Sequence, residues 1–192
     1  GESRFTVHEL LRQYALEGLK ADPEAWRAAR DRHSAYYAES LAARGEALKG
    51  PQQMAALDAI SADFENIRTA WTFAIEAGAW ERVWCMLYGL VRFCYLRMLV
   101  EELLGMLGNL HAAAAARDDL EARLLETAVV AVRSAIRSNV EGGAQREDRE
   151  ELKAYWKYAP ALKLEGIPGF IALLLCEEYA CCLLYTSPSP RD

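Results

Sequence analysis

The sequence predicts an all-α protein in which helical hairpins stack into a right-handed superhelix. No stretch of four to eight residues alternates apolar and polar side chains between turn residues, as a half-buried strand would. Apolar residues instead recur three and four positions apart, which is the period of an amphipathic helix. Predicted helix pairs begin roughly every 40 residues, and a hairpin that cannot bury its own apolar face is stabilised by stacking on the next.

The first two helices have clear starts. Residues 6–20 are expected to form a helix with Thr6 as its N-cap, and its apolar stripe is Val7, Leu10, Leu11, Tyr14, Ala15 and Leu19. The pair Asp22 and Pro23 then predicts a second helix, because Asp caps a helix and Pro suits its first turn. Its apolar face is Trp26, Ala29, His33, Tyr36, Tyr37 and Leu41, and it is expected to stop at Gly50.

The helix expected over residues 51–78 joins the two parts of the chain. One continuous stripe runs along it, formed by Met54, Leu57, Ile60, Phe64, Ile67 and Trp71. Charged and amide residues between these positions predict a solvated opposite face, formed by Asp58, Asp63, Glu65, Asn66 and Arg68. So narrow and aromatic a stripe needs partner helices on both sides, and we expect Phe64, Ile67 and Trp71 to be buried against Trp84 and Phe93.

The following segments continue as helices. Residues 80–97 are apolar nearly all round and predict a buried helix, with residues 101–116 as its antiparallel partner. Asp118 or Asp119 is expected to cap the next helix, which breaks at the Gly142–Gly143 doublet. The apolar face of this helix is formed by Leu120, Leu124, Ala128, Val132 and Ile136. Residues 145–164 and 170–181 are predicted to form a further, interrupted pair.

Three segments resemble motifs of bacterial STAND-type transcriptional regulators of the LuxR and antibiotic-regulator kind. FTVHELLRQYA (5–15) is similar to the last helix of their winged-helix subdomain, which closes an NB-ARC-like ATPase module. FENIRTAW (64–71), with Leu57, resembles the signature that opens their tetratricopeptide-like arm. LVRFCYLR (90–97) resembles a later helix of that arm, although Met98 and Leu99 replace the expected Gly and His.

The resemblance implies a domain organisation. Residues 1–20 would be a winged-helix remnant, 22–78 a connecting helical hairpin and 79–181 a truncated tetratricopeptide-like array. It also implies a non-catalytic, cytoplasmic sensor arm that binds a small inducer or a protein partner and signals to the ATPase. The alternative is a free-standing tetratricopeptide-like interaction scaffold. ATP or ADP and Mg²⁺ are implied for the parent protein, with no cofactor in this segment.

Composition excludes several other functions. The 192 residues carry a formal net charge of −6 at pH 7, and the pI is about 5.2, so we expect no nucleic acid to bind this segment. The most hydrophobic window, residues 80–100, contains Glu81, Arg82, Arg92 and Arg97, and we expect no membrane span. The five cysteines lack C-x-x-C spacing, which suits a reducing compartment. Cys85, Cys94, Cys176 and Cys181 lie in apolar runs and are expected to be buried.

The sequence predicts no enzyme. It has no G-x-x-x-x-G-K-[ST] phosphate loop, and its three histidines, His8, His33 and His111, have no cysteine at ligand spacing. By the resemblance, His8 would approach a bound nucleotide and report its state; the alternative is a histidine that fixes the turn at a helix N-terminus. Trp26, Trp71, Trp80, Trp84 and Trp156 could line a groove. The alternative is a role in the core, which aromatic residues at helical spacing more often have.

The last eleven residues, 182–192, resemble translated sequencing adapter, so we assign them no function. The chain also opens without Met inside the winged-helix motif, so we expect it to be part of a longer protein. If the array is cut after residue 181, the apolar face of its last helix lacks the next repeat. We therefore expect self-association through that face.

Overall fold

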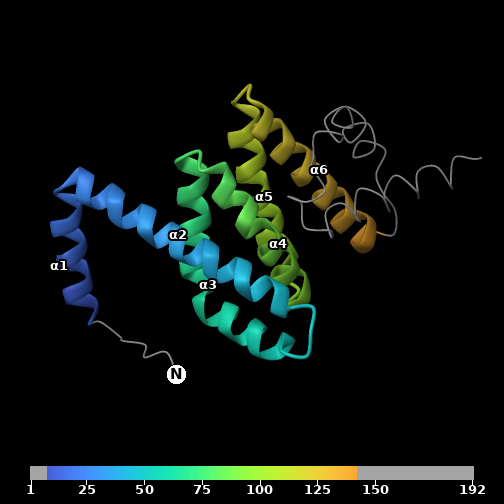
Figure 1. The fold of residues 1–192 in the computed structure, drawn as a ribbon, viewed down its shortest axis with the longest axis horizontal. Coiled ribbons are helices and arrows are strands. Elements are labelled where there is room, and N and C mark those ends of the chain that lie inside the picture. The colour runs from blue at the N-terminus through green and yellow to red at the C-terminus, as the bar shows by residue number, and fades with distance from the viewer. Residues whose placement is uncertain (1–7, 142–192) are drawn as a thin grey trace, which may run out of the picture.

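The computed structural model describes residues 8–141, and this span is helical with short turns and no strand (Figure 1). It confirms the all-α prediction. The start of the winged-helix motif, the Gly142–Gly143 break, the pair over 145–181 and the tail at 182–192 lie outside the described residues. So do Cys176, Cys181 and Trp156.

The six helices of the described span follow the predicted order. They are α1 (Glu9–Lys20), α2 (Pro23–Ala47), α3 (Gln53–Glu76), α4 (Trp80–Leu96), α5 (Val100–Ala115) and α6 (Leu120–Glu141). α2 and α3 form the hairpin expected over 22–78, joined by a turn through Gly50 and Pro51. The Gln53 side chain donates a hydrogen bond of 2.8 Å to the Leu48 carbonyl and so completes the end of α2.

Capping residues fix the helix starts. Asp22 caps α2 as predicted, and its carboxylate accepts from the backbone N–H groups of Glu24 and Ala25. Asp119 caps α6 by accepting from Ala122. The prediction of Thr6 as the first cap is wrong, because α1 begins at Glu9 and His8 is its N-cap. Sequence spacing locates a helix well but its first residue poorly.

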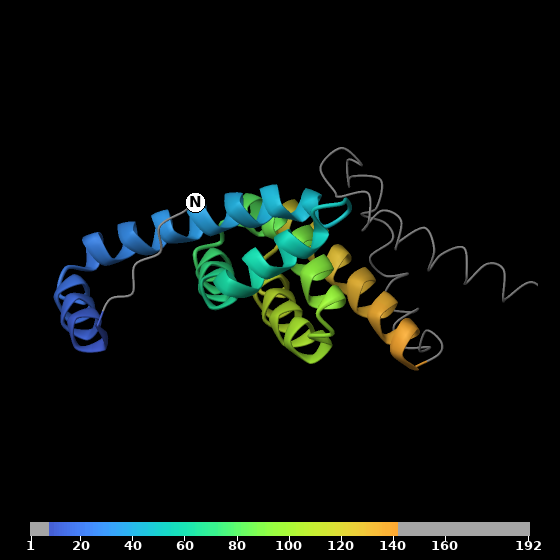
Figure 2. The ribbon, with the colours of Figure 1, turned by 90° about the horizontal axis from the view of Figure 1, so that it is seen from below.

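Helices α2 to α6 form one stack. Each helix from α2 to α5 packs on its successor, and α2 also packs on α4, α3 on α5, and α4 on α6. Contacts between every second helix are those of consecutive hairpins laid side by side. α1 packs chiefly on α2 and projects from one end of the stack (Figure 2). The hairpin of α2 and α3 therefore belongs to the same stack as α4 to α6.

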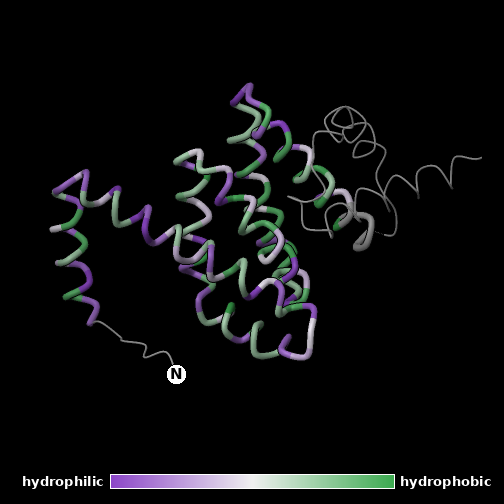
Figure 3. Tube along the Cα trace, viewed as in Figure 1, coloured by the Kyte–Doolittle hydropathy of each residue, from purple (hydrophilic) through white to green (hydrophobic). Residues whose placement is uncertain are grey.

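The apolar stripe of α3 forms the centre of the core. Leu57, Ile60, Ile67 and Trp71 are buried, Phe64 is half-buried, and the Phe64 and Phe93 rings lie 5.1 Å apart. The Trp71 indole N–H donates to the Met106 carbonyl at 3.4 Å. α3 thus has partners on several sides, α2, α4 and α5, as its stripe predicted. In Figure 3 the apolar segments of α4 and α5 lie within this part of the stack.

Two residues of α3 differ from the prediction. Met54 is exposed, because it precedes the part of the helix that other helices cover. Asp63 was expected on the solvated face but is buried, and its carboxylate forms an ion pair of 2.7 Å with Arg44 of α2. The spacing of apolar residues in α3 could not show that the long Arg44 side chain of another helix reaches Asp63. On the predicted apolar faces of α2 and α6, Tyr36 and Leu120 are exposed.

The turns after α3 and α4 have the same hydrogen bonds. After α3, Ala79 N–H bonds to the Ala74 carbonyl, and Gly78 has a positive φ of 66°. After α4, Leu99 N–H bonds to the Cys94 carbonyl, and Met98 has a positive φ of 57°. Both are Schellman ends, in which glycine is usual at the left-handed position. The replacement of Gly by Met98 therefore leaves the turn intact, with a left-handed backbone at a non-glycine residue.

Candidate functional site

An open pocket of about 340 Å³ lies where the first turns of α2 meet the end of α3. It is lined by Trp26, Arg27, Arg30, Phe73, Glu76 and Ala77. Asp22 and Pro23 set the start of α2, and the antiparallel hairpin brings these early turns beside the C-terminal turn of α3. The buried Ser34 hydroxyl donates to the Ala70 carbonyl at 2.9 Å and fixes the register of the two helices just below the pocket.

Arg30 is held in place on the pocket wall. Its guanidinium forms an ion pair with Glu76 at 2.9 Å, lies 4.6 Å from the Phe73 ring centre and lies 5.7 Å from that of Trp26. A carboxylate and two aromatic faces therefore restrict this side chain, and it serves to organise the wall. Because the pair is partly exposed, the pair itself contributes little stability.

Trp26 and Arg27 complete the wall of the pocket on α2. The Trp26 indole is half-buried, and the Lys20 ammonium lies 5.7 Å from its ring centre. Arg27 is exposed, and within residues 8–141 it makes no ion pair or hydrogen bond. The pocket thus offers an apolar ring face beside a guanidinium that is available to an incoming anion.

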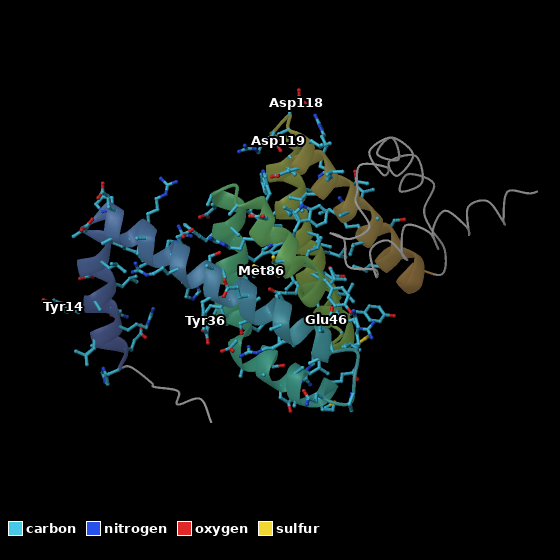
Figure 4. All side chains as sticks on the ribbon, in the orientation of Figure 1. Tyr14, Tyr36, Glu46, Met86, Asp118 and Asp119 are labelled. Atoms are coloured by element: carbon cyan, nitrogen blue, oxygen red, sulfur yellow. The ribbon has the colours of Figure 1, made fainter. Side chains whose placement is uncertain are left out.

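A second exposed feature is the outer face of α1, formed by Leu10, Leu11 and Tyr14. Their exposed fractions are 69%, 63% and 78%, and no residue of α1 is buried. Figure 4 shows Tyr14 pointing away from the stack, and Figure 3 shows apolar segments along this outlying helix. The predicted stripe exists as a helical face, but within the described residues little of it is covered.

His8 lies at the exposed start of α1. Its Nδ1 accepts a hydrogen bond from the Leu10 N–H at 3.3 Å, so the imidazole caps the helix. This is the arrangement expected of a histidine that fixes the turn at a helix N-terminus. A contact between His8 and a nucleotide stays a prediction, because that contact would need groups from outside the described residues.

The motif residues of α3 and α4 have mainly structural contacts. Ile67, Ala70, Trp71, Leu90 and Phe93 are buried in the core. Arg68 pairs with Glu65 at 3.1 Å and with Glu102 of α5 at 2.9 Å, and Arg97 pairs with Asp58 of α3 at 2.6 Å. These arginines connect neighbouring helices at the surface of the stack.

The remaining candidates show no reactive arrangement in residues 8–141. No group of three or more His, Cys, Asp or Glu side chains there could hold a metal ion. Cys94 is buried, and desolvation raises the pKa of its thiol to about 12, with the Glu102 charge adding to the effect. The prediction for Cys85 is wrong, because this thiol is exposed on the outer side of α4.

The tryptophans are divided between core and surface. Trp71 and Trp80 are buried and Trp84 is half-buried, whereas Trp26 lines the open pocket. A groove shared by all of them is therefore wrong for the described tryptophans. Sequence reasoning missed Arg30, Phe73 and Glu76 as pocket residues, because they come from two helices whose register only the packed hairpin sets.

Comparisons with protein-family models, with curated proteins and with solved structures find no match to this chain. Among the described helices, none combines the length and the apolar character that a bilayer-spanning helix needs.

Proposed function

We propose that this chain is the non-catalytic sensor arm of a STAND-type bacterial transcriptional regulator, acting in the cytoplasm by binding an inducer or a protein partner. The observation that supports this most is the contrast between α1 and the stack. α2 to α6 share a core, whereas α1 packs chiefly on α2 and leaves Leu10, Leu11 and Tyr14 exposed. An apolar helix face of this kind suits contact with a neighbouring module.

The arrangement provides a physical route for signalling. α2 packs on α1 at one end and on α3 and α4 along the rest of its length. A ligand that binds the α2–α3 pocket with different affinity in two orientations of α1 would shift the balance between them. The chemistry of ATP hydrolysis, with its Mg²⁺, belongs in this proposal to the parent protein, where His8 would lie near the nucleotide.

The test is to recover the DNA that lies 5′ of the first codon from the source genome. The proposal expects, within roughly 300 residues upstream, a G-x-x-x-x-G-K-[ST] loop that follows a predicted strand and opens a helix. A long upstream reading frame without such a loop, or a start codon immediately before Gly1, contradicts it.

The second candidate is a free-standing tetratricopeptide-like scaffold. The open pocket on a stack of helical hairpins favours the scaffold as much as the sensor arm, because such stacks present surfaces to protein partners. The two candidates differ in what they predict for α1. A scaffold needs no module on Leu10, Leu11 and Tyr14, so changing these residues to Glu, Lys and Gln leaves its partner binding intact. In a sensor arm the same changes uncouple ligand binding from the ATPase.

A further inference from the structure

The pocket between α2 and α3 has a chemistry that narrows the class of ligand. Lys20, Arg27 and Arg30 surround Trp26, against the single pocket carboxylate of Glu76. The nearby Asp22 carboxylate accepts from the α2 N-terminus, and Asp31 pairs with Arg82 at 3.0 Å. Glu24, exposed one turn before Arg27, is a further carboxylate near this end of α2. The excess of positive charge is therefore confined to the pocket lining, where two arginines face one carboxylate.

The shape of the pocket favours a protein ligand. Small-molecule sites bury most of the ligand in a concave cavity of about 300–1,000 Å³. This pocket is near the lower limit, at about 340 Å³, and is open to the surface. A partner protein brings its own surface to exclude water around an anchoring side chain, and Trp and Arg are the residues most enriched at the energetic centres of such interfaces.

We propose that the α2–α3 pocket binds an acidic peptide segment of a partner protein, with a carboxylate on Arg27 and an apolar or aromatic side chain against Trp26. Within residues 8–141, Arg27 has no ion pair that a carboxylate would have to displace, whereas Arg30 is already bound to Glu76. Glu76 would repel a carboxylate placed at Arg30 and so directs the anion towards Arg27. This inference names the partner class for the binding role proposed above and rests on that role.

The test uses the full 192-residue chain and fluorescein-labelled synthetic peptides of equal length, followed by fluorescence anisotropy. One peptide is Glu-rich with two Phe, the second has Ala in place of Phe, and the third is Lys-rich with two Phe. We expect the Glu-rich peptide with Phe to bind most tightly and its affinity to fall as salt rises.

Two matched variants locate the site. Arg27→Glu should weaken binding of the Glu-rich Phe peptide about tenfold or more, because the charge that meets the carboxylate is reversed. Arg32→Glu makes the same charge change at an exposed position on the same helix outside the pocket, and should alter the affinity by less than about twofold. Trp26→Ala should abolish the difference in affinity between the Glu-rich peptides with Phe and with Ala. Circular dichroism checks that each variant is folded.

Four results would overturn the proposal. These are equal binding of the Lys-rich peptide, equal weakening by Arg27→Glu and Arg32→Glu, no binding of any peptide by the folded chain, and 1-naphthoate binding more tightly than the peptides. The last result would assign the pocket to a small aromatic anion. The peptide experiment and the search for an upstream phosphate loop can fail independently. A phosphate loop without peptide binding refutes only the pocket assignment, and peptide binding without a phosphate loop refutes only the sensor-arm function.

Discussion

Gly45 of α2 lies directly against Gly89 of α4. A Cβ atom built on Gly45 would be 3.3 Å from the Gly89 Cα, and one on Gly89 would be 2.9 Å from Leu41 Cγ and 3.0 Å from the Leu41 carbonyl oxygen. The two helices therefore cross with their backbones nearly in contact. This crossing joins the first hairpin to the second, so the stack depends on the absence of side chains at both positions.

Gly89→Ala should destabilise the protein by about 1–2 kcal/mol. The new methyl group overpacks the crossing, and this outweighs the gain in helix propensity, which is at most about 1 kcal/mol. Urea denaturation followed by circular dichroism measures the change. Gly105→Ala in α5 is the control: no atom lies within 4 Å of its Cβ position, so it should stabilise the helix by about 0.5–1 kcal/mol. Equal stabilisation by both substitutions would refute the close crossing.

Met98→Gly should stabilise the protein by about 0.5–1 kcal/mol, because it removes the left-handed strain of a side chain that is itself 80% exposed. Thermal unfolding would show a raised Tm. Gly78→Ala, at the equivalent position after α3, should have the opposite effect. A lowered Tm for Met98→Gly would mean that Met98 makes stabilising contacts large enough to offset its backbone conformation.

Trp71→Ala should cost about 3–5 kcal/mol, mainly because of the cavity it leaves in the core. It also removes the donor to the Met106 carbonyl. Trp26→Ala is the matched comparison, because its ring is half-buried at the pocket, and it should cost far less. Chemical denaturation of the two variants gives both values. Similar losses would show that α3 does not organise the core.

Cys94 should resist alkylation, whereas Cys85 should react readily. The Cys94 thiol is buried with a pKa of about 12, so at pH 8 it is almost wholly protonated and shielded. Iodoacetamide labelling followed by peptide mass spectrometry separates the two sites. Because burial raises the folded-state pKa from about 9, the neutral thiol favours the native state below pH 9. That contribution should be lost as pH rises from about 9 to 12, and Cys94→Ser should remove this part of the pH dependence.

The purified chain should neither bind nor hydrolyse ATP. Its sequence has no phosphate loop and no Lys-Ser/Thr pair to hold the phosphates and Mg²⁺. Isothermal titration calorimetry with Mg-ATP should give no stoichiometric heat. A measured stoichiometry near one would contradict a purely non-catalytic arm.

The sequence by itself determined the local structure. Its three- and four-residue spacing located all six described helices, Asp22 and Asp119 marked two of their starts, and the α3 stripe identified Ile67 and Trp71 as core residues. These features follow from interactions between residues a few positions apart in the chain, so they can be predicted from a single sequence. Spacing predicted α1 as a helix in the same way, although it could not predict that Leu10, Leu11 and Tyr14 would be exposed.

Only the tertiary structure decided which helix faces meet. The burial of Asp63 depends on Arg44 from another helix, and the pocket forms because Trp26 and Arg30 lie beside Phe73 and Glu76. The register that joins these residues is set by packing between segments far apart in the sequence, including the hydrogen bond from the Ser34 hydroxyl to the Ala70 carbonyl. Helical periodicity shows which residues share a face, but the partner of that face is chosen by the free energy of the whole packed core.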